Sequence, residues 1–337
     1  MIPPEPRANP DLVGHDDAAR TLEEAARSGR MPHAWLIAGP PGLGKATLAY
    51  RFARWLLAGL PPSIPGQPPL ALAESDPVFR RVAAGAHADL FSMAPNTGER
   101  GKKEVLRAEE ARGALRFLSM TAAEGGWRAL VVEELERAER AVVPNILLKT
   151  LEEPPPRTVQ LLVTSQPGAL LPTIRSRCRR LDLFPLAEPA LAGLLGHWLP
   201  ELPEAERAGL ARIADGCPGR ALLLAEGEGL ALQAMVEEVL AGLPRLDPRR
   251  VLDIADRVTA RRDAGALATF MALLRRALAA ALRRAGRGEA TPWVAGRSLA
   301  EWSTLWDKLG QLADETERLN LDRKQAVITG LGLLSVR

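Results

Sequence analysis

HAWLIAGPPGLGKAT, residues 33–47, joins a short apolar run to a glycine-rich loop, a lysine and the start of a second apolar stretch. Residues 34–38 are expected to form a buried strand, because the run is short, continuous and bounded by glycine and proline. Residues 46–57 are long and apolar enough to form a helix. A strand that enters a helix through a glycine-rich loop is typical of an α/β domain.

The loop itself has the spacing of a phosphate-binding loop. Gly39, Gly42 and Gly44 let backbone N–H groups curve around a phosphate without clashes from a Cβ atom, and Lys45 can reach its terminal oxygens. The start of the helix adds a partial positive charge. The alternative is an ordinary Gly/Pro turn with a solvated lysine, and the Gly-x₄-Gly-Lys spacing between strand and helix favours a P-loop.

Further apolar runs continue the α/β pattern outward from this loop. Runs at residues 88–94, 129–132 and 158–164 predict three more core strands, separated by helical stretches. Strands that alternate with helices favour a parallel sheet flanked by helices. The first part of the chain is therefore expected to be one α/β domain.

No strand is expected after about residue 185, where the chain becomes rich in Ala and Leu, broken by Pro and Gly. The later helices of this part are predicted at 249–262, 264–285, 298–318 and 321–335. We predict three domains, because the chain is too long for one core. These are a P-loop-like domain over 1–185, a small helical domain over 186–245 and an all-α domain over 246–337.

The composition excludes several classes of protein. Aromatic residues make up 4% of the chain, which argues against a surface on which nucleic-acid bases stack. Two cysteines exclude a four-cysteine zinc site and a disulfide framework. We find no signal-peptide core and no apolar run of membrane-spanning length, so we expect a cytoplasmic protein without a membrane partner. The 44 basic and 41 acidic residues give a net charge of +3, which is compatible with nucleic acid but does not indicate it.

Two positions that would hold Mg²⁺ beside a P-loop depart from the usual residue types. Ala46 follows the lysine and cannot ligate a metal, and the hydroxyl of Thr47 lies about 100° further around the helix. After the third predicted strand, Glu133 and Glu134 replace the expected Asp-Glu pair. Glu133 is one methylene longer than Asp, which moves its carboxylate in a site that demands octahedral geometry. The changes predict weak or absent hydrolysis and leave open whether ATP or ADP and Mg²⁺ bind.

Five further stretches carry motifs: NPDLVGH (9–15), HAWL (33–36), HADL (87–90), NILLKTLEEPP (145–155) and LPTIRSRC (171–178). Together with the P-loop they resemble one known family, the AAA+ clamp-loader subunits of bacterial DNA polymerase III. The resemblance covers most of the chain, and the last two stretches are its most specific part. It implies an AAA+ module, with the small helical domain as a lid and the all-α domain as an oligomerisation collar.

Within this family the chain resembles the δ′ type more than the ATP-hydrolysing γ/τ type. The motor type carries a four-cysteine zinc module between the P-loop and the acidic strand motif, whereas residues 46–133 contain no cysteine. Ala46 and Glu133 also differ from the residues of the motor type, which again favours the δ′ type. The resemblance therefore implies a clamp-loader component without zinc, with no polymerase activity and little or no ATPase activity of its own.

The resemblance also assigns site residues. Arg177, in the Ser-Arg-Cys motif, would act in trans as an arginine finger on a neighbour's nucleotide, although by charge alone it is one more surface arginine. Thr164, with Ser165 beside it, matches a first sensor or caps its strand, and Arg220 matches a second sensor or packs the helical domain. The residues of the degenerate nucleotide site are Gly39, Gly42, Gly44, Lys45, Ala46, Thr47, Glu133, Glu134, Thr164 and Arg220. No role is assigned to Lys149, Glu152 or Glu153.

The partners that the resemblance implies are the γ/τ and δ clamp-loader subunits and, through the complex, the sliding clamp and primer–template DNA. Two alternatives stay open. An active AAA+ ATPase would hydrolyse ATP as an isolated chain, and hydrolysis would depend on Lys45. A stand-alone nucleic-acid-binding module would bind DNA tightly with a steep dependence on salt. The near balance of basic and acidic residues argues against the second.

Overall fold

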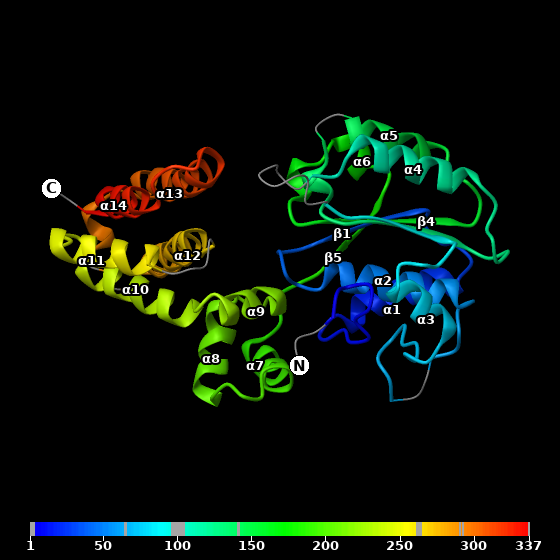
Figure 1. Ribbon diagram of the computed structural model, residues 1–337, viewed down its shortest axis with the longest axis horizontal. Helices are drawn as coiled ribbons and strands as arrows, with labels where there is room; N and C mark the ends of the chain where they lie inside the picture. The colour runs from blue at the N-terminus through cyan, green and yellow to red at the C-terminus, as the bar shows by residue number, and fades with distance from the viewer. Residues whose placement is uncertain are drawn as a thin grey trace. The chain divides into compact units, whose positions relative to one another are not determined.

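The computed structural model describes residues 4–63, 66–95, 105–139, 142–260, 265–289, 291 and 293–335. The chain forms two compact units (Figure 1). The first comprises Met1–Glu201 with Asp215–Arg220, and the second comprises Leu202–Ala214 with Ala221–Arg337. The finer division into three domains stays a prediction.

The first unit is built on a five-stranded parallel sheet. Its strands are β1 (Ala34–Ala38), β2 (Leu90–Met93), β3 (Arg128–Val132), β4 (Thr158–Thr164) and β5 (Arg179–Asp182). Their order across the sheet is β2-β3-β4-β1-β5. The four strands predicted from apolar runs are confirmed, as is an α/β domain with a parallel sheet flanked by helices. The fifth strand, β5, is missing from the prediction because only Leu181 of its residues is buried.

Helices cover both faces of the sheet (Figure 1). One face carries α1 (Asp16–Arg27), α2 (Lys45–Leu57) and α3 (Pro77–Ala83), and the other carries α4 (Ala108–Ser119), α5 (Val142–Glu152) and α6 (Pro172–Arg175). Strand residues alternate between the two cores: Trp35 and Ile37 pack with α1 and α2, whereas Leu36 packs with α4 and α5. Short 3₁₀ turns follow β3 and β4, at η1 (Leu135–Arg137) and η2 (Pro167–Ala169). The helix α7 (Glu188–Trp198) also lies in this unit.

The second unit is helical. It contains α8 (Glu204–Ile213), α10 (Gly229–Gly242), α11 (Pro248–Thr259), α12 (Ala266–Gly286), η3 (Val294–Gly296), α13 (Leu299–Leu319) and α14 (Arg323–Leu334), while α9 (Pro218–Glu226) belongs to both units. The four helices predicted here are confirmed to within a few residues at each end. Residues 261, 262 and 264 of that prediction lie outside the described residues. No helix within the described ranges is both long and apolar enough to cross a membrane.

Two buried arginines of α2 hold the N-terminal segment against the first unit. Arg54 donates to the carbonyl oxygens of Arg7 and Asn9, at 2.9 and 2.7 Å. Arg51 donates to the carbonyl of Pro10, at 2.5 Å. Burial lowers the pKa of Arg54 to about 10, so much of its hydration has been replaced by these carbonyl groups. The segment that follows is thereby held close to the P-loop.

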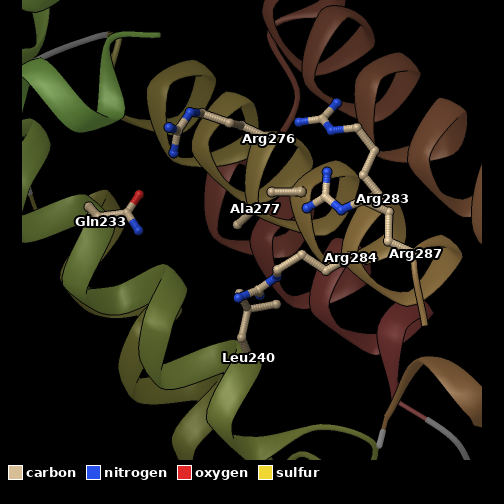
Figure 2. A pocket seen from close by; sticks show the side chains of 8 residues that line it. Gln233, Leu240, Arg276, Ala277, Arg283, Arg284 and Arg287 are labelled. Atoms are coloured by element: carbon tan, nitrogen blue, oxygen red, sulfur yellow. The ribbon is translucent and has the colours of Figure 1, made fainter. Parts of the chain in front are cut away.

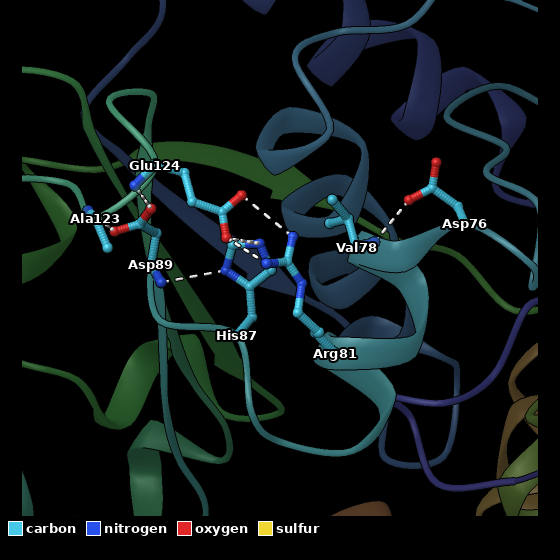
Figure 3. Close-up of polar contacts among 7 residues, drawn as sticks. All are labelled: Asp76, Val78, Arg81, His87, Asp89, Ala123 and Glu124. Carbon is cyan, nitrogen blue, oxygen red and sulfur yellow. Dashed lines mark hydrogen bonds and ion pairs between the residues drawn. The ribbon is translucent and has the colours of Figure 1, made fainter.

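A second polar cluster fixes the loop that leads into β3 (Figure 3). The carboxylate of Asp89 is buried and accepts hydrogen bonds from the backbone N–H groups of Ala123 and Glu124, at 2.7 and 2.9 Å. Buried His87 accepts from the N–H of Asp89 through Nδ1, and Arg81 forms an ion pair with Glu124. The cluster therefore fixes the loop at the amino end of β3, the strand that carries Glu133 just beyond its last residue.

Asp89→Ala is expected to destabilise the first unit by about 2–4 kcal/mol. The substitution leaves two partly buried N–H donors without acceptors, each at about 1–3 kcal/mol. Urea unfolding followed by circular dichroism measures the change. Asp17→Ala is the matched control, because the Asp17 side chain is fully exposed and its loss is expected to cost about 0.5 kcal/mol or less. Equal effects of the two substitutions would contradict the role of Asp89.

Candidate functional site

The loop between β1 and α2 can be built only with glycine at three positions. Gly39, Gly42 and Gly44 have φ angles of 156°, 73° and 94°, in the region that residues with a side chain rarely adopt. A Cβ on Gly42 would lie 2.7 Å from the backbone nitrogen of Arg220, so the loop is also packed closely from outside. The N–H of Gly219 donates to the Gly42 carbonyl at 2.7 Å. The predicted P-loop conformation is therefore present.

His15 fixes the loop from the N-terminal side. Its Nε2 lies 2.8 Å from the carbonyl oxygen of Leu43, which can only accept, so Nε2 carries the proton. Burial is the main influence on the pKa of His15 and lowers it, so the ring is held in its neutral form. The packing of Leu12 against the same core completes this support.

Lys45 is turned back onto its own loop. Only 6% of the residue is exposed, and Nζ donates to the carbonyl of Pro40 at 2.6 Å and to Oγ of Ser165 at 2.9 Å. Burial lowers its pKa, and the negative charge of Glu136 is the largest influence in the opposite direction. The lysine thus already has hydrogen-bond partners where β1 and β4 end.

Glu136, which no sequence motif indicated, links the turn after β3 to the end of β4. Its carboxylate accepts from Oγ1 of Thr164 at 2.8 Å and from the N–H of Ser165 at 2.9 Å. The predicted sensor residue Thr164 is therefore bonded to a carboxylate, and Ser165 is the residue that contacts Lys45. The only signal in the sequence is that Glu136 is the third carboxylate of Glu-Glu-Leu-Glu after β3.

The residues expected at a metal position do not form one. Ala46 offers only a methyl group, and Thr47 is buried on α2. Glu133 accepts a hydrogen bond from the hydroxyl of Tyr50 at 2.8 Å, and burial raises its pKa. Glu134 is half exposed and forms an ion pair with Arg137 at 3.0 Å. In the described part of the chain no group of three or more His, Cys, Asp or Glu side chains could hold a metal ion, so the donors do not fit Mg²⁺.

Arg220 reaches the P-loop through its backbone. Its guanidinium forms an ion pair with Asp215 at 3.0 Å, while its N–H lies against Gly42 at the start of α9. Cys217 is buried beside it, and burial raises the pKa of this thiol. The structure thus brings Arg220, the candidate for the second sensor, to the glycine-rich loop, and its guanidinium is already paired with Asp215.

Arg177 lies at the other edge of the sheet. It comes two residues before β5, whose first residue Arg179 pairs with Trp35 near the start of β1. Because the strands are parallel, this is the amino edge, whereas Lys45 follows the carboxyl edge about 13 Å along β1. Arg177 donates to the carbonyl of Thr173 at 3.0 Å and forms an ion pair with Glu152 at 2.8 Å. The structure therefore does not bring Arg177 to the P-loop of its own chain.

Arg177 lies beside a buried residue, while its own side chain is partly exposed to solvent. Burial raises the pKa of the neighbouring Cys178 thiol to about 12, so this cysteine is a packing residue and not a nucleophile. The Arg177 side chain is 35% exposed and that of Glu152 is 51% exposed. An ion pair this exposed contributes about 0–1 kcal/mol, so the guanidinium can exchange one anion for another.

Comparisons with known proteins agree on one family. Residues 14–187 match the family model described as DNA polymerase III, delta subunit. The chain is 34% identical over 215 residues to the DNA polymerase III subunit delta' of Pseudomonas aeruginosa, covering 64% of this chain and 61% of that one. It is 33% identical over 220 residues to subunit delta' of Escherichia coli, covering 65% and 62%. It is 30% identical over 263 residues to subunit tau of Escherichia coli, covering 74% and 38%.

The match leaves part of each relative uncovered. The aligned stretch spans about three fifths of the length of the two delta' relatives. The stretch that the family model matches includes the P-loop, the acidic end of β3 and the segment around Arg177, because all of these lie within residues 14–187. Since that model matches more than half of the chain, the chain belongs to the DNA polymerase III delta-subunit family.

Proposed function

We propose that the chain is a δ′-type subunit of a clamp-loader complex, a stator that supplies Arg177 to the nucleotide site of a neighbouring ATPase subunit. The observation that carries the proposal is the position of Arg177 at the amino edge of the sheet, away from its own P-loop. A guanidinium placed there cannot serve a nucleotide bound beside Lys45, but it can reach a phosphate presented by another subunit.

The chemistry of the Arg177 pair supports this role. The guanidinium binds a carboxylate through a charge-assisted contact, and its planar fork suits phosphate oxygens equally well. In other nucleotide hydrolases, an arginine that neutralises charge on the phosphoryl group in the transition state raises the rate roughly 10³–10⁵-fold. A subunit can therefore be needed for hydrolysis without hydrolysing ATP itself.

The changes in the chain's own nucleotide site also support the stator role. Lys45 is bonded to Pro40 and Ser165, so a phosphate has to replace these partners before the lysine can bind it. Glu133 already accepts a hydrogen bond from Tyr50, and no two other His, Cys, Asp or Glu side chains join it in a metal-binding group among the described residues. Any ATP or ADP held by the loop would therefore lack the metal chemistry that hydrolysis requires.

The assembly belongs to the same proposal. The partners are the γ/τ and δ clamp-loader subunits, and the sliding clamp and primer–template DNA are reached through the complex. The chain works in the cytoplasm, with the region 186–245 acting as a lid and 246–337 as an oligomerisation collar. Of the rival functions, an active ATPase is disfavoured by Ala46 and the bonded Glu133, and a stand-alone nucleic-acid-binding module by the near balance of basic and acidic residues.

Arg177→Ala is expected to slow clamp loading by the assembled complex roughly tenfold or more, because the neighbouring site loses its arginine. Arg177→Lys is expected to slow clamp loading as well, since an ammonium lacks the planar fork of a guanidinium. The measurements are DNA-stimulated ATPase activity and the rate of clamp loading in reconstituted complexes, with assembly checked by gel filtration.

Two matched controls separate the finger from general charge effects. Arg175→Ala removes an exposed arginine two residues away and is expected to leave both rates unchanged. Glu152→Gln removes the partner of Arg177 but keeps the guanidinium, and is also expected to preserve both rates. Normal rates with Arg177→Ala in a fully assembled complex would refute the proposed role.

The isolated chain is expected to show no ATP turnover, and Mg²⁺ is not expected to strengthen nucleotide binding. The reason is that Ala46 and the bonded Glu133 leave the metal without ligands. Titration with a fluorescent ATP analogue, with and without Mg²⁺, and a phosphate-release assay on the same samples measure both quantities. Mg²⁺-dependent turnover that Lys45→Ala abolishes would instead establish an active ATPase.

A further inference from the structure

A groove rich in arginine lies between α10 and α12, within the second unit. Its volume is about 420 Å³. One wall is formed by Arg276, Arg283, Arg284 and Arg287 on α12 and at its C-terminal end, and the other by Gln233 and Leu240 of α10 (Figure 2). This groove is separate from the nucleotide loop and from Arg177, which both belong to the first unit.

The positive charge of the groove is only partly compensated. The sequence of α12, ALATFMALLRRALAAALRRAG, contains four arginines and no carboxylate. Arg287 is bonded to Glu289, at 3.1 Å. Arg283 and Arg284 are exposed, and neither forms an ion pair with another residue that the structure describes. The groove therefore presents two guanidinium groups to an anionic ligand.

A buried hydrogen-bond acceptor in the groove indicates which further chemical group that ligand carries. The amide nitrogen of Gln233 donates to Glu237 at 3.0 Å, which fixes the orientation of the amide because a carboxylate can only accept. The other end of the amide, Oε1, is buried and has no hydrogen-bond partner among the described residues. An unpaired buried acceptor costs free energy, which an N–H donor on the ligand would recover.

A peptide carries both kinds of group that the groove needs. Carboxylates of Asp or Glu suit Arg283 and Arg284, and a backbone N–H suits Oε1 of Gln233. A phosphodiester backbone carries the negative charge but offers no N–H donor. The lining also has no aromatic side chain on which a base could stack. Ala277 and Ala280 have small side chains that leave room for a peptide main chain between the two helices.

We propose that the α10–α12 groove binds an acidic peptide segment of a partner protein. Arg283 and Arg284 hold its carboxylates, and Gln233 accepts one of its N–H groups. The surface is an interaction site in addition to the role of Arg177, and it does not depend on that role. Its ligand is anionic and brings an N–H donor on its main chain, which a phosphodiester backbone lacks.

The test uses the full chain and three fluorescein-labelled probes in about 0.15 M salt, where surface charges are screened beyond about 8 Å. The probes are a decapeptide of alternating Glu and Ala, the same peptide with Gln for Glu, and a thymidine oligonucleotide with the charge of the acidic peptide. Fluorescence anisotropy gives the dissociation constant of each. Binding of the acidic peptide in preference to both other probes is the expected result.

Two variants locate the binding. The double variant Arg283→Ala/Arg284→Ala is expected to weaken binding of the acidic peptide roughly tenfold or more, because charge-assisted hydrogen bonds are lost. Gln233→Met removes the acceptor at similar volume and is expected to weaken peptide binding severalfold while leaving oligonucleotide binding unchanged. The matched control is Arg318→Ala/Arg323→Ala, which removes two exposed arginines of α13 and α14 and is expected to change nothing. Circular dichroism confirms that each variant is folded.

Three outcomes would overturn the proposal. The first is no measurable binding of the acidic peptide by the folded wild-type chain. The second is peptide binding that the control variant weakens as much as the groove variant does, which would indicate general electrostatic attraction. The third is preferential binding of the oligonucleotide that depends on Arg283 and Arg284 but not on Gln233, which would assign the groove to nucleic-acid phosphate.

Discussion

The parallel pairing of β1 with β4 and β5 is the constraint on which the rest of the first unit depends. It places every strand's carboxyl end at one edge, so the P-loop, the Thr164–Ser165 turn and the acidic residues after β3 meet there. The same pairing sends the segment before β5 to the opposite edge, with Arg177 at its end. One sheet therefore separates the glycine-rich loop and Lys45 from Arg177.

At the carboxyl edge, Lys45 is held by groups of its own chain. A buried ammonium needs compensation for lost hydration, and here Pro40, Ser165 and the charge of Glu136 provide it within the chain. The glycines are still required, because the loop adopts positive φ angles and packs against Arg220. The loop thus has a structural role of its own beside Ala46.

The sequence predicted the features that depend on local pattern and missed those that depend on pairing across the fold. Apolar runs located four strands, and glycine spacing located the loop. The strand β5 has one buried residue, and the pairing of Glu136 with Thr164 joins residues 28 apart, so neither has a local signature. The opposite placement of Arg177 and Lys45 follows only from strand order and register. The resemblance selected Arg177 as a candidate, a choice that stays a prediction, and only the fold shows which edge of the sheet it occupies.

Arginine dominates the basic residues of this chain, and the structure divides its arginines by what each guanidinium binds. Arg54 is buried on carbonyl oxygens, so it acts as a fixed support for the N-terminal segment. Arg177 is held by the Thr173 carbonyl and by the exposed carboxylate of Glu152. Arg283 and Arg284 bind no described carboxylate and line a groove. The free energy needed to recruit an arginine to a ligand falls in that order, because its existing contacts are first buried, then exposed and then absent. The partner of each guanidinium, and not the net charge of +3, therefore determines which arginines can function at an interface.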